Sequence, residues 1–472
     1  MTGSALRVTW VQPEDLVGHE LRQAAEDGRD ARDVEARWLA AGGLPAPARA
    51  GASSPPAPAG LRRLAVQLLD ELALLPREGP GREPDGPDAI RAACPDWPTA
   101  PGPVAGTDDA LLERLHAAWL GRAAGCLLGK PVEKLPLTGI RQLARAAGNW
   151  PLTGWFTARG VPAELLATYP WNARSAATSL AENIDGMPED DDLNYPLLNL
   201  LLTQRHGRGF TTSDVARVWL DELPAGRTFT AERVAYRNLL TGLVPPDTAR
   251  HRNPFREWIG ALIRADLHGW THPGDPGAAA EQAARDAALT HSGNGVYAAM
   301  FAAAAVARAA DGSSDVHAAL RTGLSVVPPR SRLAGAVRHG IRLALEEPDF
   351  DLVVDSLHQA YGQYHWVHAV PNSALLAAAL TRGDGDFGAT VCRAVSCGLD
   401  TDSNGATAGS IAGLLAGHPD ALGAAWTAPL AGRLATSVGG LDGIGFDRLA
   451  RLTLQQTHRP APGTRPGRAT TR

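Results

Sequence analysis

One stretch near the C-terminus constrains the fold of this chain more than any other. Residues 397–417 read C-G-L-D-T-D-S-N-G-A-T-A-G-S-I-A-G-L-L-A-G, so Asp400, Asp402 and Ser403 stand directly before a run of small and apolar residues. This pattern predicts a buried helix that carries its acids in the first turn. The small side chains predict that this helix packs closely against other helices.

The two carboxylates of this stretch stand two residues apart beside an apolar helix. They repel each other and are costly to bury, so either their pKa values rise or a cation sits between them. Mg²⁺ suits such a place, because it takes oxygen ligands from carboxylates, hydroxyls and water. A plain helix cap, which is a frequent use of Asp and Ser, is the alternative that this stretch alone leaves open.

A second acidic run, residues 189–192 (E-D-D-D), precedes a helical pattern at residues 195–204. Acids at a helix start interact favourably with the helix dipole, so a solvated first turn would explain this run by itself. If the fold brings the two helix starts together, however, five carboxylates and a hydroxyl converge, and that charge density requires metal. Two bridged Mg²⁺ ions would neutralise it better than one.

Prenyl-diphosphate and terpene enzymes are another all-α class that binds Mg²⁺. They use a D-D-x-x-D helix motif, whereas residues 190–194 read D-D-D-L-N. The sequence therefore does not support that class.

The rest of the chain predicts an all-α protein. From Thr211 onward, helical patterns alternate with short Pro/Gly breaks, and no sustained period-2 run indicates a strand. A length of 472 residues predicts more than one unit. We expect a mostly helical N-terminal accessory region at 1–75 with a short strand at 7–11, a Pro/Gly-rich linker at 76–106, a catalytic domain at 107–456 and a disordered tail at 457–472.

Charge and cysteine usage narrow the function classes. A net charge of −5 gives no electrostatic case for nucleic acid or an anionic membrane as partner. The four cysteines show neither a C-x-x-C pair nor a zinc spacing, which indicates free thiols in a reducing compartment. The sequence lacks a signal-peptide pattern and a membrane-length apolar run, so we expect a cytoplasmic protein.

Four segments, in this order along the chain, resemble the ADP-ribosylglycohydrolase family. They are G-R-A-A-G-C-L-L-G-K-P-V-E at 121–133, D-D-D-L-N-Y at 190–195, A-L-T-H-S-G-N-G at 288–295 and G-L-D-T-D-S-N-G-A-T-A-G-S-I-A-G at 398–413. The resemblance covers about residues 111–454. It implies an all-α, roughly orthogonal multi-helix fold with a small N-terminal appendage outside it, and a cleft that holds a binuclear Mg²⁺ centre. Family members hydrolyse the glycosidic bond between ADP-ribose and a protein side chain or another acceptor.

The resemblance also assigns roles to individual residues. It implies metal ligands at Asp190, Asp191, Asp192, Asp400, Asp402 and Ser403. It implies catalytic roles for Glu133, Asp191, Asp192 and Asp402, and a substrate-binding role for Glu133, His291, Asn294 and Gly295. For His291, a helix-end histidine that contacts carbonyl groups is the alternative interpretation.

The sequence departs from the family pattern at three positions. Cys126 stands where the first motif usually has Asp, Asp190 replaces a hydroxyl residue, and Leu193 stands where Thr is common. These changes bear on the substrate more than on the metal site. We therefore expect an Mg²⁺-dependent hydrolase acting on ADP-ribosylated protein or a ribosylated small molecule. The alternatives are a catalytically weakened protein that binds ADP-ribose or a nucleotide, and a partner-binding role centred on residues 1–75.

Overall fold

The computed structural model describes residues 6–77 and 80–458. Its N-terminal half contains α1 (Pro13–Glu26), α2 (Arg32–Ala40), α3 (Ala59–Leu74), α4 (Pro87–Ala93), α5 (Asp108–Gly129), α6 (Leu137–Ala146), α7 (Ala163–Thr168), α8 (Ala176–Ser179), α9 (Asp191–His206), α10 (Thr212–Glu222) and α11 (Thr230–Leu240). Its C-terminal half contains α12 (Asp247–Arg250), α13 (Asp266–Trp270), α14 (Pro276–Ala287), α15 (Asn294–Ala309), α16 (Val316–Ser325), α17 (Arg332–Glu346), α18 (Phe350–Tyr361), α19 (Ala369–Gly383), α20 (Phe387–Ser396), α21 (Thr401–Ala416), α22 (Ala424–Thr427) and α23 (Phe446–Thr457).

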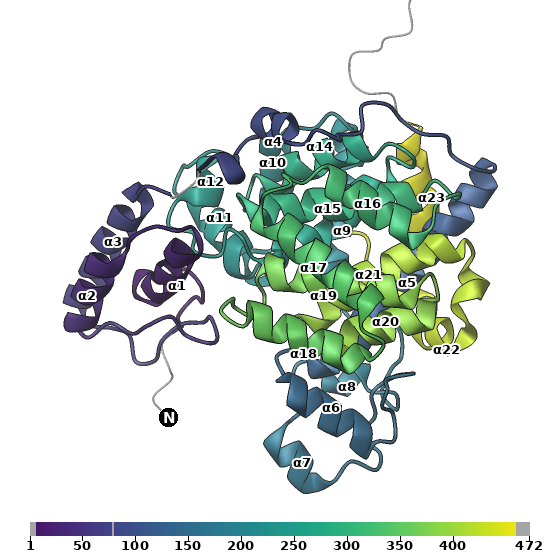
Figure 1. Ribbon diagram of the computed structural model, residues 1–472, viewed down its shortest axis with the longest axis horizontal. Coiled ribbons are helices and arrows are strands. Elements are labelled where there is room, and N and C mark those ends of the chain that lie inside the picture. The colour runs from purple at the N-terminus through teal and green to yellow at the C-terminus, as the bar shows by residue number, and fades with distance from the viewer. Residues whose placement is uncertain (1–5, 78–79, 459–472) are drawn as a thin grey trace, which may run out of the picture.

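Short 3₁₀ turns and one small hairpin complete the fold (Figure 1). The turns are η1 (Pro80–Arg82), η2 (Lys130–Val132), η3 (Ala225–Arg227), η4 (Ile259–Arg264), η5 (Pro419–Leu422) and η6 (Ala428–Leu430). Strands β1 (Arg433–Leu434) and β2 (Ile444–Gly445) pair antiparallel, with Arg433 opposite Gly445. The predicted all-α class is thus confirmed.

Helices α5 and α21 lie antiparallel and in direct backbone contact. A Cβ added at Gly125 of α5 would lie 1.9 Å from the carbonyl oxygen of Gly405 on α21, and one added at Gly405 would lie 2.2 Å from that of Gly125. Gly121 and Gly409 face each other in the same way one turn further along. The small residues of α21 are therefore required by its closest neighbour, and the contact places the end of α5 beside the start of α21.

The remaining body surrounds this pair. The Ala-rich helix α15 is buried along almost its whole length and packs against α13 as well as against α14 and α16, which lie beside it in Figure 1. Thr107 caps α5, because its side chain accepts a hydrogen bond from the backbone N–H of Ala110.

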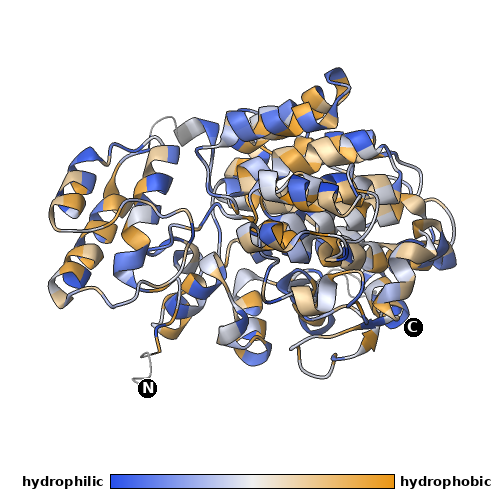
Figure 2. Cartoon of the chain, turned by 90° about the horizontal axis from the view of Figure 1, so that it is seen from below, coloured by the Kyte–Doolittle hydropathy of each residue, from blue (hydrophilic) through white to orange (hydrophobic). Residues whose placement is uncertain are grey.

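The N-terminal region (residues 6–77) forms a smaller lobe with its own apolar cluster, and polar and apolar residues alternate along its helices (Figure 2). Leu16, Trp38 and Leu68 belong to that cluster, which extends into the body through Phe255 and Trp258. The lobe therefore shares buried apolar surface with the body, which stabilises their association.

The strand expected at residues 7–11 does not form. Residues 9–10 make a turn, and Trp10 has a φ of 63°, a left-handed conformation that interrupts an extended segment. The backbone N–H of Trp10 instead donates to the carbonyl of Gly51.

The segment at residues 76–106, predicted as a linker, packs against the body as well as connecting the two parts of the chain. It contains α4, and both Ile90 and Trp97 are buried in the main core. Glu83 pairs with Arg332 of the body at 2.8 Å. The tail predicted at residues 457–472 lies outside the described residues from position 459 onward, and the domain boundaries stay a prediction.

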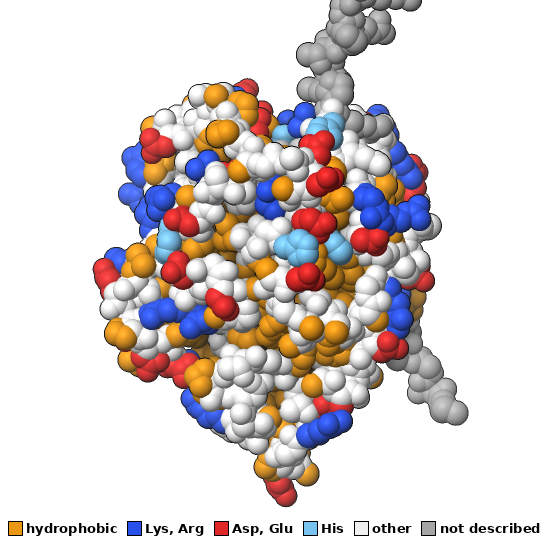
Figure 3. Space-filling view, turned by 90° about the vertical axis from the view of Figure 1, so that its right-hand side faces the viewer, with side chains coloured by type: hydrophobic (Ala, Val, Ile, Leu, Met, Phe, Trp, Pro, Cys, Tyr) orange, Lys and Arg blue, Asp and Glu red, His pale blue; other side chains and the backbone are white. Residues whose placement is uncertain are grey.

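The surface offers no single dominant charge on the face drawn in Figure 3, where acidic, basic and apolar side chains are interspersed. Among the helices described, none combines the length and hydrophobicity that crossing a membrane requires.

We predict that Gly405→Ala destabilises the protein by about 1–3 kcal/mol, because the added methyl group meets the backbone of α5 and forces the two helices apart. Urea unfolding measures the change. Gly335→Ala on α17 is the matched control: a Cβ there meets nothing within 4 Å, so the better helix former should add up to about 1 kcal/mol. Equal stability of Gly405→Ala and the unmutated protein would contradict the close contact.

Candidate functional site

The two acidic runs of the sequence meet in space. The hydroxyl of Ser403 donates to Asp192 Oδ2 at 3.2 Å, which joins the start of α21 to the start of α9. Oxygen atoms of Glu133, Asp400 and Asp402 lie within 4.8 Å of one another. We call the assembled group the acid cluster; its members are Glu133, Asp190, Asp191, Asp192, Asp400, Asp402 and Ser403.

Helix geometry positions each part of the acid cluster. Asp190 is the N-cap of α9 and accepts from the backbone N–H of Asp192 at 2.9 Å. Asp400 is the N-cap of α21 but makes no side-chain cap bond, so its carboxylate is free to point elsewhere. Glu133 follows the 3₁₀ turn η2 at the end of α5. Because α5 and α21 are antiparallel, Glu133 arrives beside the first turn of α21.

Burial and mutual repulsion raise the pKa values of most of these carboxyl groups. Burial raises the pKa of Asp402 to about 7, with further repulsion from Glu133 and Asp190. The pKa values of Asp191 and Asp192 rise well above the usual range, first through burial and then through Asp190. That of Asp400 rises through burial and then through Asp402 and Glu133. The site therefore favours a bound cation that would let these groups ionise.

Lys130 supplies one positive charge inside the site. Its ammonium group pairs with Asp190 Oδ2, and both side chains are almost fully buried. Burial opposes ionisation of Asp190, but Lys130 outweighs it and holds the pKa of that carboxyl below its usual value. Asp190 is therefore already neutralised by the protein itself.

Arg122 supplies a second charge, and it is a residue that the sequence reasoning missed. It is fully buried; its Nη2 lies 3.3 Å from Asp192 Oδ1 and its Nη1 lies 2.5 Å from Asp266 Oδ2. Its Nε also donates to the backbone carbonyl of Asp192 at 2.8 Å. Arg122 thus holds both the side chain and the backbone of Asp192. The available signal was an Arg inside the otherwise apolar stretch at residues 117–129.

Glu133 lies at the more exposed edge of the acid cluster. Its Oε1 pairs with Lys134 Nζ at 2.6 Å, and its Oε2 accepts from Asn172 Nδ2 at 2.8 Å. The Lys134 ammonium group also lies 5.8 Å from the ring centre of Trp366. Glu133 is therefore oriented by two polar partners at the rim of the site.

The other residues predicted to bind substrate belong to a different bonded network. His291 is buried, and its Nδ1 lies 2.6 Å from the hydroxyl of Thr290. Burial lowers the pKa of His291 well below its usual value, so its ring is neutral. Asn294 donates to Glu257 Oε1 at 3.0 Å through both its backbone and its side chain. Gly295 follows directly, and its backbone N–H donates to the carbonyl of Ser292. The substrate-binding role of His291, Asn294 and Gly295 stays a prediction.

Comparison with known proteins identifies the family. The sequence model of the ADP-ribosylglycohydrolase family matches residues 107–460, so the chain belongs to that family. No curated protein matches the chain. Among solved structures, a chain titled "ADP-ribosylglycohydrolase-related protein complex" is similar to it, at 20% sequence identity and a TM-score of 0.44 over 74% of this chain and 98% of that one.

We predict that Arg122→Ala destabilises the protein by about 3–5 kcal/mol, because it leaves the buried carboxylates of Asp192 and Asp266 without their partner. Arg122→Lys should lower the free energy of unfolding by less, because Lys keeps the positive charge although it lacks the planar set of donors. Urea unfolding measures both. Arg451→Ala, which breaks an exposed pair with Asp447, is the control and should change stability by less than about 0.5 kcal/mol.

Proposed function

We propose that this protein is an Mg²⁺-dependent hydrolase that cleaves the glycosidic bond of an ADP-ribosylated protein or a related ribosylated small molecule. The observation that carries the proposal is the unbalanced charge of the acid cluster. Lys130 pairs with Asp190, and Arg122 serves Asp192. Within residues 6–77 and 80–458, no lysine or arginine forms an ion pair with Asp191, Asp400 or Asp402. Buried carboxyl groups of this kind ionise only when a cation compensates their charge, so the site favours cation binding.

The chemistry of the donors fits a hard divalent ion. Carboxylates and one hydroxyl are offered, and the single nearby thiol, Cys126, is fully buried with a pKa that burial raises well above its usual value. We assign the ions to Asp191, Asp192, Asp400, Asp402 and Ser403. Asp190, also predicted as a ligand, instead keeps Lys130 in place and caps α9. A bound Mg²⁺ pair would supply Lewis acidity toward sugar hydroxyls and water.

The side chains of the acid cluster suit the chemistry of a ribosyl bond. Breaking the bond at C1 of ribose builds positive charge on the sugar ring, and fixed carboxylates stabilise that charge where water is excluded. Glu133 stands at the rim with its carboxylate held by Asn172 and Lys134, which suits it to orient the substrate. A glycosyl hydrolase activity follows from this arrangement and from the family.

A hollow that reaches Leu399, the chain neighbour of Asp400, supports a nucleotide as part of the substrate. Its volume is about 170 Å³, and Tyr361, Tyr364 and Trp366 are among the residues that line it. Aromatic walls of this kind hold flat rings by stacking. The hollow shares Trp366 with the Lys134 side of the rim.

The second candidate is a protein that binds ADP-ribose or a nucleotide without hydrolysing it. The observation that favours it is Cys126, whose sulfur lies within 4.8 Å of oxygen atoms of Asp190 and Asp192. A neutral thiol there removes a charge that the family usually provides. Calorimetry that shows tight binding of ADP-ribose together with no turnover would support this candidate over the hydrolase.

We predict that Asp400→Ala and Asp402→Ala each lower the release of free ADP-ribose from an ADP-ribosylated peptide by roughly 100-fold, because each removes a metal-binding carboxylate. Chelation of divalent ions should abolish the release, and added Mg²⁺ should restore it. Asp420→Ala, at a highly exposed acid outside the site, is the control and should keep full activity. Unchanged activity of both active-site variants would refute the proposed mechanism.

We predict that Trp366→Ala raises KM by roughly tenfold with little change in kcat, because it removes a stacking surface for the nucleotide and leaves the acid cluster intact. Steady-state kinetics separate the two constants. Trp366→Phe keeps an aromatic face and should recover most of the affinity. A fall in kcat at constant KM in Trp366→Ala would show that the ring does not bind substrate.

A further inference from the structure

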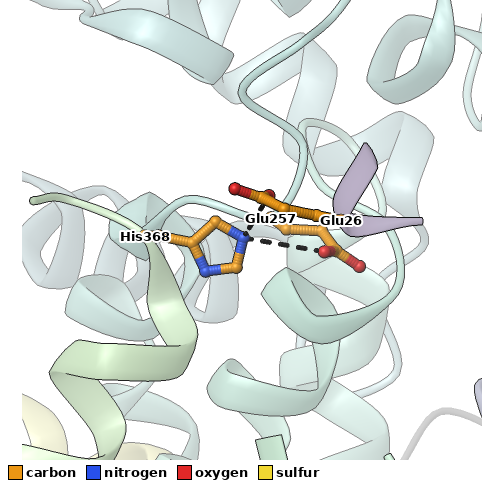
Figure 4. Close-up of side chains that lie close together, drawn as sticks. All are labelled: Glu26, Glu257 and His368. Atoms are coloured by element: carbon orange, nitrogen blue, oxygen red, sulfur yellow. Dashed lines mark ion pairs between the residues drawn. The ribbon is translucent and has the colours of Figure 1, made fainter. Parts of the chain in front are cut away.

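A second cluster of potential metal ligands lies where the N-terminal region meets the body. His368 Nε2 lies 3.3 Å from Glu26 Oε2 and 3.7 Å from Glu257 Oε2, and Figure 4 shows both carboxylates turned toward the imidazole ring. Glu26 ends helix α1, Glu257 precedes η4 and His368 caps α19. The cluster therefore ties the N-terminal region to two elements of the body.

The hydrogen bonds of this cluster argue against a metal ion. The backbone N–H of Val370 donates to His368 Nδ1 at 3.1 Å, so Nδ1 carries no proton and the proton of the neutral ring resides on Nε2. Glu257 is also occupied, because its Oε2 accepts from Gln23 at 3.0 Å and lies 2.8 Å from Arg332 Nη2. The Nε2–H of His368 thus points toward the two carboxylates at ion-pair distance, and the cluster is a polar junction.

The junction continues into the acid cluster through Asn372, one turn into α19. The Asn372 side chain is fully buried, and its Nδ2 donates to the carbonyls of His368 at 2.9 Å and Trp366 at 2.8 Å. Its Oδ1 accepts from the backbone N–H of Asp400 at 3.2 Å and from Asn404 Nδ2 at 2.8 Å. One amide therefore joins the start of α19 to the start of α21.

The N-terminal region also reaches the opposite side of the site. Arg49 Nη2 donates to the backbone carbonyl of Lys134 at 3.4 Å, and Lys134 pairs with Glu133. The region thus contacts the segment that carries Glu133 and, through His368, the segment that holds Asp400.

We propose that the N-terminal region is a structural part of the active site. In this arrangement Asn372 is a positioning residue that fixes the backbone of Asp400. His368 and Glu26 connect Asn372 to α1. The functional importance of Asn372 rests on the proposed function of the acid cluster. The hydrogen bonds that join α19 to α21 do not depend on that function.

Hydrogen exchange measured by mass spectrometry on the full-length protein tests the link without reference to activity. Asn372→Ala removes the acceptor of the Asp400 N–H, so exchange in the peptide that covers residues 397–404 should be roughly tenfold faster. Binding of Mn²⁺, used as the probe for the acid cluster, should weaken by roughly tenfold. Unchanged exchange and unchanged Mn²⁺ affinity would overturn the proposal.

The matched control is Asn238→Ala. Asn238 is equally buried and its side chain donates to the carbonyls of Thr248 and His251, away from the acid cluster. It should lower the melting temperature without changing exchange at residues 397–404. If Asn238→Ala accelerates that exchange as much as Asn372→Ala does, the effect reflects general destabilisation and the positioning role is overturned.

The distant end of the link is tested with His368→Asn, which can still cap α19, and with Glu26→Gln, which keeps the shape of the side chain. Both should accelerate exchange at residues 397–404 by a few-fold, and they serve as the test if Asn372→Ala does not fold. Asp70→Asn, which weakens an exposed pair with Arg252 between the same two parts, should leave it unchanged. Exchange at residues 397–404 as slow in both junction variants as in the unmutated protein would overturn the role of the N-terminal region.

The outcome is separable from that of the proposed function. Faster exchange in the junction variants of a protein that releases no ADP-ribose would support the structural link and refute the hydrolase. Full hydrolase activity in those variants, with exchange as slow as in the unmutated protein, would support the hydrolase and refute the structural link.

Discussion

The direct backbone contact between α5 and α21 is the constraint on which the rest of the structure depends. Glycines at positions 121, 125 and 129 of one helix face glycines or backbone atoms of the other, and no larger side chain fits between them. Such contact gains dispersion energy over many atom pairs, but only while both helices keep one register. That register decides where the last turn of α5 ends. It therefore also decides that Lys130 and Glu133 stand beside Asp400 and Asp402.

The same contact explains why so many acids can be placed in the interior. Each carboxylate opposes the ionisation of its neighbours, and burial strengthens that opposition. Two fixed cations compensate part of this charge: Lys130 pairs with Asp190, and Arg122 pairs with Asp192. Both come from α5 or its immediate end, so one helix supplies the close contact and the internal charges. Asp191, Asp400 and Asp402 receive no such partner, and we assign them to metal together with Asp192 and Ser403.

Local signals made much of this predictable from the sequence. The small residues after Ser403 indicated a closely packed helix, and Asp190 stood at a helix start, where the structure finds its side chain accepting a cap bond. Partners that are distant along the chain were not predictable in the same way. Arg122 read as one more residue of an apolar helix, although its partners lie at residues 192 and 266. The strand expected at residues 7–11 failed because the backbone of Trp10 adopts a left-handed turn, which an alternating pattern does not reveal.

The N-terminal region shows the same limit at a larger scale. The sequence predicted that this region is mostly helical, but nothing local indicated which surface of the body it covers. In the structure Glu20 and Gln23 of α1 and its C-cap residue Asp27 face buried charges of the body, and Arg256 pairs with Glu20 and Asp27 at 2.9 Å each. Breaking such buried pairs is costly, because each leaves an uncompensated charge. A region held in this way is fixed in one orientation, and fixed contact with the segments around Asp400 and Glu133 is what a positioning role requires.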